Sequence, residues 1–157
     1  EIDLVGCWVR FFDENSNETR MFFKPPTSSK EIRNMLCFNS AVCHPTWFMR
    51  STIFRDVGFY NEKYDTAQDY DFLCRLVVSH NIANIGEYLL DYRISGSGIS
   101  LKKRKRQLGV RFEVQRKNFD WKNWRSYAGL VRTLILWSIP VSVLAPIKTI
   151  VFGKRSK

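Results

Sequence analysis

Asp69 has the residue type and the position that acid–base chemistry would need. It lies near the start of the segment 66–80, whose apolar residues recur at helical spacing. A carboxylate in the first turn of a helix is stabilised as an anion by unpaired backbone N–H groups and by the helix dipole. Such a group can take the proton from an attacking hydroxyl, as a general base does. The alternative is that Asp69 only caps its helix.

Two further groups of polar residues are candidates for binding a substrate. His44 precedes Pro45 at the edge of a predicted strand, where it could face a bound substrate, although a lone histidine is more often structural. Arg93 leads into a loop with Ser95, Ser97 and Ser100, whose donors suit a diphosphate. The alternative for this second group is an ordinary surface loop.

The elements that must position these residues follow from periodicity and turn signals. Residues 4–12 and 19–23 predict a β-hairpin, and Ser28 or Ser29 is suited to cap a helix over 30–37. We predict a strand over 41–50 and a short helix that Ser51 caps and Gly58 ends in left-handed geometry. Thr66 is placed as the N-cap of the helix that carries Asp69, and 82–93 predicts another strand.

Four segments occur in the order and spacing of family-two inverting glycosyltransferases, and residues 1–100 resemble that family. They are Cys43–Arg50 (CHPTWFMR), Gly58–Glu62 (GFYNE), Ala67–Leu76 (AQDYDFLCRL) and Leu89–Ser100 (LLDYRISGSGIS). In the family, the segment around Asp69 usually reads Glu-Asp after a small residue, and that aspartate is taken as the base. Gln68 stands here where the glutamate is usual.

The resemblance implies an α/β fold, namely the carboxy-terminal half of a Rossmann-like GT-A domain. It also implies a nucleotide-sugar donor and transfer to an acceptor hydroxyl with inversion. Asp69 would be catalytic, and Gln68, His44, Arg93, Ser95 and Ser100 would bind substrate. A divalent metal, Mg or Mn, would be bound by a half of the fold that precedes Glu1. We therefore expect residues 1–157 alone to be inactive.

Asp69 and Asp71 also form the D-x-D pattern by which this class of enzyme binds its metal. Residues two apart on a helix point about 200° away from each other around the axis. Two aspartates that open an amphipathic helix are therefore poorly placed to hold one ion. We predict no metal ligand in this chain.

The net charge of +10 is carried entirely by the carboxy-terminal segment. Residues 1–100 contain 10 Lys and Arg against 13 Asp and Glu, whereas residues 101–157 contain 15 against 2. We therefore divide the chain into a transferase half over 1–100 and a helical, basic and apolar tail over 101–157. A basic appendage on a mildly acidic body is typical of a segment that meets a polyanion.

The tail is predicted to associate with an anionic membrane surface. Its uncharged stretch, residues 133–147, contains two prolines and is shorter than the roughly 20 residues that span a bilayer. An interfacial segment is expected instead, with the protein at the cytoplasmic face of the cell membrane. The acceptor would then be a sugar or a lipid-linked precursor of surface polysaccharide or glycolipid.

Two other functions are compatible with the sequence. The basic residues of the tail, with Trp121 and Trp124 between them, could bind nucleic acid, but the apolar stretch that follows is unlike a solvated DNA-binding arm, so no nucleic acid is expected. The chain could also be a non-catalytic, membrane-tethered interaction domain. The four cysteines form no C-x-x-C pair and have no zinc-ligand spacing, which favours buried, reduced thiols. The amino terminus shows no signal peptide.

Overall fold

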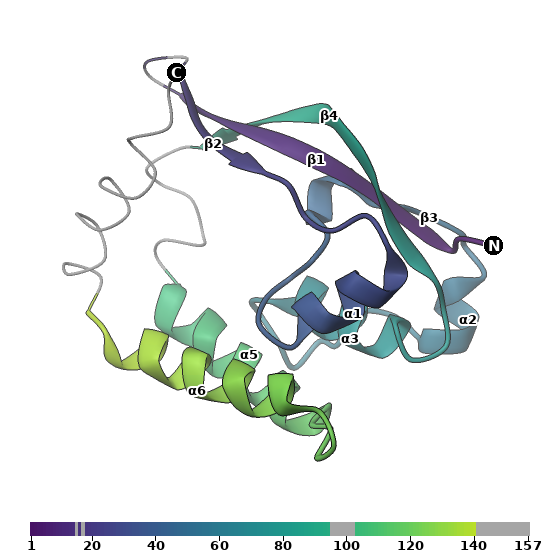
Figure 1. Ribbon diagram of the computed structural model, residues 1–157, viewed down its shortest axis with the longest axis vertical. Helices are drawn as coiled ribbons and strands as arrows, with labels where there is room; N and C mark the ends of the chain where they lie inside the picture. The colour runs from purple at the N-terminus through teal and green to yellow at the C-terminus, as the bar shows by residue number, and fades with distance from the viewer. Residues whose placement is uncertain (15, 17, 95–102, 141–157) are drawn as a thin grey trace.

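The protein is a mixed α/β structure in which helices lie on one side of a four-stranded sheet (Figure 1). The computed structural model describes residues 1–14, 16, 18–94 and 103–140. The sheet is organised around β1 (Leu4–Asp13). The strands β2 (Thr19–Phe23) and β3 (Phe48–Met49) pair antiparallel with β1, whereas β4 (Ile82–Ile94) pairs parallel with it along its length.

The hairpin, the first helix and the last strand confirm the predictions from the sequence. Helix α1 (Ser29–Leu36) is capped by Ser28, whose hydroxyl accepts a hydrogen bond from the Glu31 N–H and donates one to the Glu31 carboxylate. This reciprocal arrangement satisfies one of the free N–H groups of the first turn. It fixes the point at which the chain leaves the sheet and enters the helical layer.

The predicted strand over 41–50 is wrong for most of its length. Residues His44–Thr46 form a 3₁₀ turn, η1, and only β3 is extended. Pro45 lies inside this turn, and it has no N–H to donate to a strand partner. The Thr46 hydroxyl accepts a hydrogen bond from the Cys7 N–H at 3.3 Å, which ties the turn to β1.

The starts of the next two helices differ by one residue from the prediction. Helix α2 (Ile53–Val57) follows Thr52 rather than Ser51, and Gly58 ends it with a φ of 78° but an extended ψ of −175°. Helix α3 (Gln68–Leu76) follows Ala67, which has the left-handed φ of 54°, so Thr66 is not the N-cap. A left-handed alanine is not a recognised signal in a sequence, because glycine or asparagine normally takes this conformation.

One hydrophobic core joins the sheet to the helices on both sides of the predicted division at residue 100. Phe72, Leu73 and Leu76 of α3 are fully buried, together with Leu4 of β1. Helix α5 (Arg104–Lys117) adds Val114 to the same core. The first helix of the basic segment therefore packs as part of the body.

Helix α6 (Trp124–Ser138) lies beside α5 at the end of the described chain (Figure 1). Its Gly129 meets the body so closely that a Cβ there would lie 1.9 Å from the Cys37 carbonyl oxygen. The Arg132 guanidinium donates to the Phe38 carbonyl at 2.9 Å. Among the described residues, no helix is both long and apolar enough to cross a membrane.

Candidate active site

The amino-terminal end of α3 presents Asp69 at a half-buried position. Ala67 turns the chain sharply into the helix, and the Gln68 side-chain amide donates to the Tyr64 carbonyl. Gln68, a predicted substrate-binding residue, is thus engaged with the protein's own backbone. Its contact ties the start of α3 to the preceding loop, and this holds Asp69 on a rigid element.

Cys43, Tyr60 and Arg111 surround Asp69. Burial raises the pKa of the Tyr60 hydroxyl, and the negative charge of Asp69 raises that pKa further. Burial, then the neighbouring Cys7 and Asp69, raise the pKa of the Cys43 thiol to about 11, so this thiol is protonated at neutral pH. Among the residues that the structure describes, none forms a hydrogen bond or an ion pair with the Asp69 side chain.

His44 lies on the same side of the molecule and is paired with Tyr60. The His44 Nε2 and the Tyr60 hydroxyl are 3.0 Å apart, and the His44 ring stands edge-on to Trp47 at 4.7 Å. Both Tyr60 and Trp47 pack on the buried Phe72, at 5.1 and 5.8 Å between ring centroids. The histidine is exposed, but the aromatic rings behind it fix its position.

Arg111 of α5 is the charged neighbour of Asp69 that the sequence did not assign to the site. Its guanidinium lies 5.8 Å from the centroid of the Tyr70 ring. Burial lowers the pKa of Arg111, while the nearby Tyr70 and Asp69 oppose this change. Helical spacing was the signal that could have revealed it, since Arg111 follows the buried Leu108 by three residues and precedes the buried Gln115 by four.

Four buried polar atoms have no hydrogen-bond partner among the described residues. They are Arg111 Nε, Trp47 Nε1, the Thr66 hydroxyl oxygen and Asn84 Oδ1 of β4. Folded proteins normally satisfy groups of this kind. Two of them belong to Arg111, a charged neighbour of Asp69, and to Thr66, which precedes Asp69 by three residues.

Asp71 makes contacts quite different from those of Asp69. It is only 5% exposed and forms an ion pair with Arg75 at 3.0 Å. Arg75 also donates to the carbonyls of Val57 and Phe59, so Asp71 fixes the loop between α2 and α3. Within the described ranges, no three histidine, cysteine, aspartate or glutamate side chains are placed to hold a metal ion. The predicted metal, assigned to sequence before Glu1, stays a prediction.

The structure does not bring Arg93 to Asp69. Arg93 is exposed near the end of β4, paired in register with Phe12, and its guanidinium lies 3.6 Å from the Glu14 carboxylate. The η1 turn contacts β1 at Cys7, five residues before Phe12, which corresponds to about 17 Å along a strand. Ser95 and Ser100 lie outside the described residues, so the loop that contains them stays a prediction.

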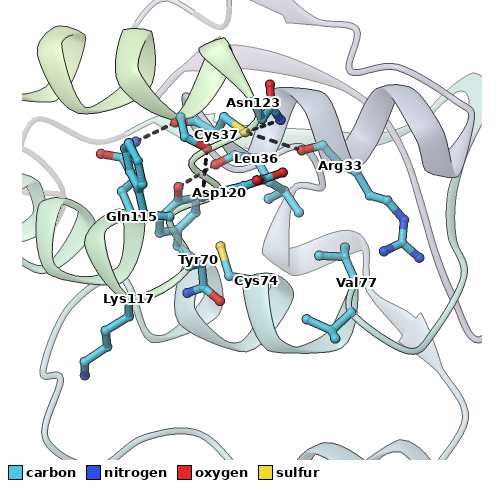
Figure 2. A pocket seen from close by; sticks show the side chains of 14 residues that line it. Arg33, Leu36, Cys37, Tyr70, Cys74, Val77, Gln115, Lys117, Asp120 and Asn123 are labelled. Carbon is cyan, nitrogen blue, oxygen red and sulfur yellow. Dashed lines mark hydrogen bonds between the residues drawn. The ribbon is translucent and has the colours of Figure 1, made fainter.

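A cavity of about 460 Å³ lies elsewhere, between α1, α3 and the turn that joins α5 to α6 (Figure 2). Figure 2 shows the thiols of Cys37 and Cys74 facing it, with Gln115 donating to the Cys37 carbonyl at 2.8 Å. Burial raises the pKa of Cys74 to about 12, so this thiol is unreactive at neutral pH. Asp69 and His44 do not line this cavity, and we do not assign the candidate site to it.

Comparison with known proteins gives one informative similarity. A curated protein of Methanocaldococcus jannaschii, described as an uncharacterized glycosyltransferase, is 31% identical to this chain over 132 residues. The match covers 83% of this chain and 44% of that protein, so the chain spans less than half the length of the relative. No protein-family model matches the chain, and no solved structure matches it.

Proposed function

We propose that this chain is part of an inverting glycosyltransferase of the family-two type, with a GT-A fold and Asp69 as its catalytic base. The observation that carries the proposal is the Asp69 carboxylate, held at the start of α3 beside Arg111 and without an ion pair among the described residues. The similarity to a protein described as a glycosyltransferase supports the reaction class. The family resemblance of the segments around Asp69 supports the inverting mechanism.

The proposed reaction is a single displacement at the anomeric carbon of the donor sugar. Asp69 accepts the proton of the acceptor hydroxyl, and the acceptor oxygen forms a bond to that carbon. The bond from the carbon to the diphosphate oxygen breaks, and the nucleoside diphosphate leaves with the electron pair. Because attack and departure occur on opposite faces of the sugar, the configuration at the anomeric carbon is inverted.

The neighbours of Asp69 have supporting roles in this proposal. The guanidinium of Arg111 is a positive charge close to Asp69 and contributes to the electrostatics of the site. The exposed His44, held by the Tyr60 hydroxyl, is placed to form hydrogen bonds with acceptor hydroxyls. The Gln68 side chain donates to the Tyr64 carbonyl and so holds the start of the helix that carries the carboxylate. In this proposal Gln68 does not bind the substrate directly.

The donor, metal and acceptor also belong to the proposal. A nucleotide sugar and a divalent Mg or Mn ion would be bound by residues outside this chain, with Ser95 and Ser100 contributing contacts to the diphosphate. The acceptor would be a sugar or a lipid-linked precursor at the cytoplasmic face of the cell membrane. The excess of basic residues after residue 100 supports a location at an anionic membrane surface.

Substitution of Asp69 by asparagine in the full-length protein tests the assignment. An asparagine side chain is nearly isosteric with that of aspartate but cannot take up the proton, so we expect turnover to fall by about 10² to 10⁴. Donor affinity and melting temperature should change little, because Asp69 forms no ion pair among the described residues. The measurements are turnover, donor binding and thermal melting of the same preparation.

Asp71→Asn is the matched control on the same helix. It weakens the buried contact with Arg75, so we expect a loss of stability of about 1–3 kcal/mol with turnover largely retained below the melting temperature. Near-normal turnover in Asp69→Asn, or a loss that follows only from unfolding, would show that Asp69 is a structural residue.

A further inference from the structure

Helix α6 packs against the protein through its small and polar residues. Ser126, Gly129 and Thr133 are its buried positions, and they recur at spacings of three and four along the helix. The Thr133 hydroxyl donates to the Gln115 side-chain oxygen of α5 at 2.8 Å. Gly129 lies directly against the Cys37 carbonyl, where no larger residue fits.

The opposite face of α6 exposes large apolar residues to the surroundings. We call it the outer face of α6, and its members are Trp124, Tyr127, Val131, Leu134 and Ile135. Trp124 is 65% exposed and Ile135 55% exposed, and Trp121 just before the helix is 79% exposed. A helix in water normally buries such residues and exposes small and polar ones. This helix exposes its large apolar residues instead, which is typical of an interaction surface.

Helices in lipid show the arrangement found in α6. Because lipid is as apolar as leucine, helices there associate through small residues and interhelical hydrogen bonds, and the large apolar residues face the lipid. The contacts of Gly129 and the hydrogen bond between Thr133 and Gln115 are of this kind. Trp124 and Tyr127, whose residue types prefer the boundary between lipid and water, lie at the start of the face. There the rings of Trp121 and Tyr127 pack edge to face with that of Phe119.

Charge identifies the lipid as anionic. The charged residues around the start of α6 are Asp120, Lys122 and Arg125, and Arg132 further along the helix donates to the Phe38 carbonyl. The Arg125 guanidinium lies 5.0 Å from the centroid of the Trp124 ring, so a cation stands directly beside the aromatic start of the face. Basic residues at a membrane surface are attracted to negatively charged head groups.

We propose that the outer face of α6 is a membrane-docking surface, which lies in the interface of an anionic bilayer with its apolar residues against the acyl chains. The helix lies on the membrane rather than crossing it, and Trp121 and Trp124 mark the level of the head groups. This inference rests on the proposed membrane location, and it does not depend on the transferase activity. It assigns the contact to α6 itself, a helix whose other side is fixed to the body.

Binding of the full chain to lipid vesicles tests the proposal without any measurement of turnover. Vesicles of phosphatidylcholine mixed with phosphatidylglycerol are compared with vesicles of phosphatidylcholine alone at physiological ionic strength, and bound protein is measured by co-sedimentation. The combined variant Val131→Ser, Leu134→Ser, Ile135→Ser should bind the anionic vesicles at least about tenfold more weakly. Lys122→Gln should weaken binding by about fivefold.

The matched control replaces three exposed apolar residues elsewhere with serine: Ile2, Val78 and Leu89. This variant should bind as the unsubstituted chain does, and circular dichroism should show that all variants are folded. The proposal is overturned if the chain does not bind anionic vesicles, if it binds neutral vesicles equally well, or if the two triple variants behave alike. It is also overturned if the chain forms a dimer that the α6 variant dissociates, because a second copy would then be the partner.

Discussion

Helices α3 and α6 differ in which of their sides the protein buries. Helix α3 buries Phe72, Leu73 and Leu76 and leaves Asp69 half-exposed at its first turn. Helix α6 buries small and polar residues and exposes its large apolar ones. The protein's own core therefore accounts for the orientation of α3. Among the described residues, it does not account for the orientation of α6, whose exposed side we propose to be a membrane-docking surface.

The difference shows that the hydrophobicity of a residue in this molecule does not determine whether the residue is buried. Where the apolar residues of a helix are the buried ones, as in α3, a polar residue that remains near the surface is a candidate for a catalytic role. Where the large apolar residues are exposed instead, as in α6, they are candidates for contact with a partner. Matched substitutions in α3 and α6 test this interpretation.

The largest expected effect is on stability, in a comparison of Phe72→Ala in α3 with Leu134→Ala in α6. Phe72 is fully buried and contacts the rings of Trp47 and Tyr60, so we expect its truncation to cost about 3–5 kcal/mol. Leu134 is 40% exposed, and its truncation should change stability by no more than about 0.5 kcal/mol. Chemical unfolding of the two variants without lipid measures the difference. Similar costs would mean that the outer face of α6 is covered in the protein alone.

A smaller effect is expected at the buried polar contact of α6. Thr133→Val keeps the shape of the side chain but removes the hydroxyl that donates to Gln115, so we expect a loss of about 1–3 kcal/mol. Ser138→Ala is the control, because its hydroxyl donates to the Leu134 carbonyl at an exposed position. Equal melting temperatures for the two variants would show that the hydrogen bond to Gln115 does not hold α6 in place.

The smallest expected effect is a loss of stability at alkaline pH, and we expect its source to be Cys74 of α3. Burial raises the pKa of Cys74 from 9.0 to about 12, so the folded protein keeps this proton when the unfolded chain has lost it. Cys74 therefore contributes stability that is fully present below about pH 9 and is lost as the pH rises toward about 12. In Cys74→Val, the fall in melting temperature between about pH 8 and about pH 10 should be shallower. If the melting temperature of Cys74→Val falls as steeply as that of the unsubstituted protein, Cys74 is not the source of the pH dependence.

The sequence predicted the elements whose signals are local. The hairpin of β1 and β2, the cap at Ser28 and the strand β4 follow from alternation, turn residues and capping, and the structure confirms all three. The strand expected over 41–50 failed because Pro45 and the Thr46 hydroxyl favour a turn fixed to β1. The start of α3 was displaced by one residue because Ala67 adopts a left-handed conformation imposed by its surroundings.

The surroundings of Asp69 depend on contacts between segments that are far apart in the sequence, and such contacts could not be predicted from the sequence. The pairing of His44 with Tyr60 joins η1 to the loop after α2, and Arg111 comes from a helix that we had assigned to the tail by its charge. A count of basic residues does not distinguish an arginine that faces the core from one that faces solvent. Only the spacing of Arg111 from Leu108 and Gln115 carried that information.

The parallel pairing of β1 with β4 also has a consequence for the order in which the chain folds. The hydrogen bond from the Asn81 N–H to the Asp3 carboxylate closes a loop across a sequence separation of 78 residues. During synthesis, β1 can pair with β2 soon after both emerge, but its other edge has no strand to pair with until residues 82–94 have been made. Long-range pairing of this kind slows folding and leaves an open strand edge that invites aggregation.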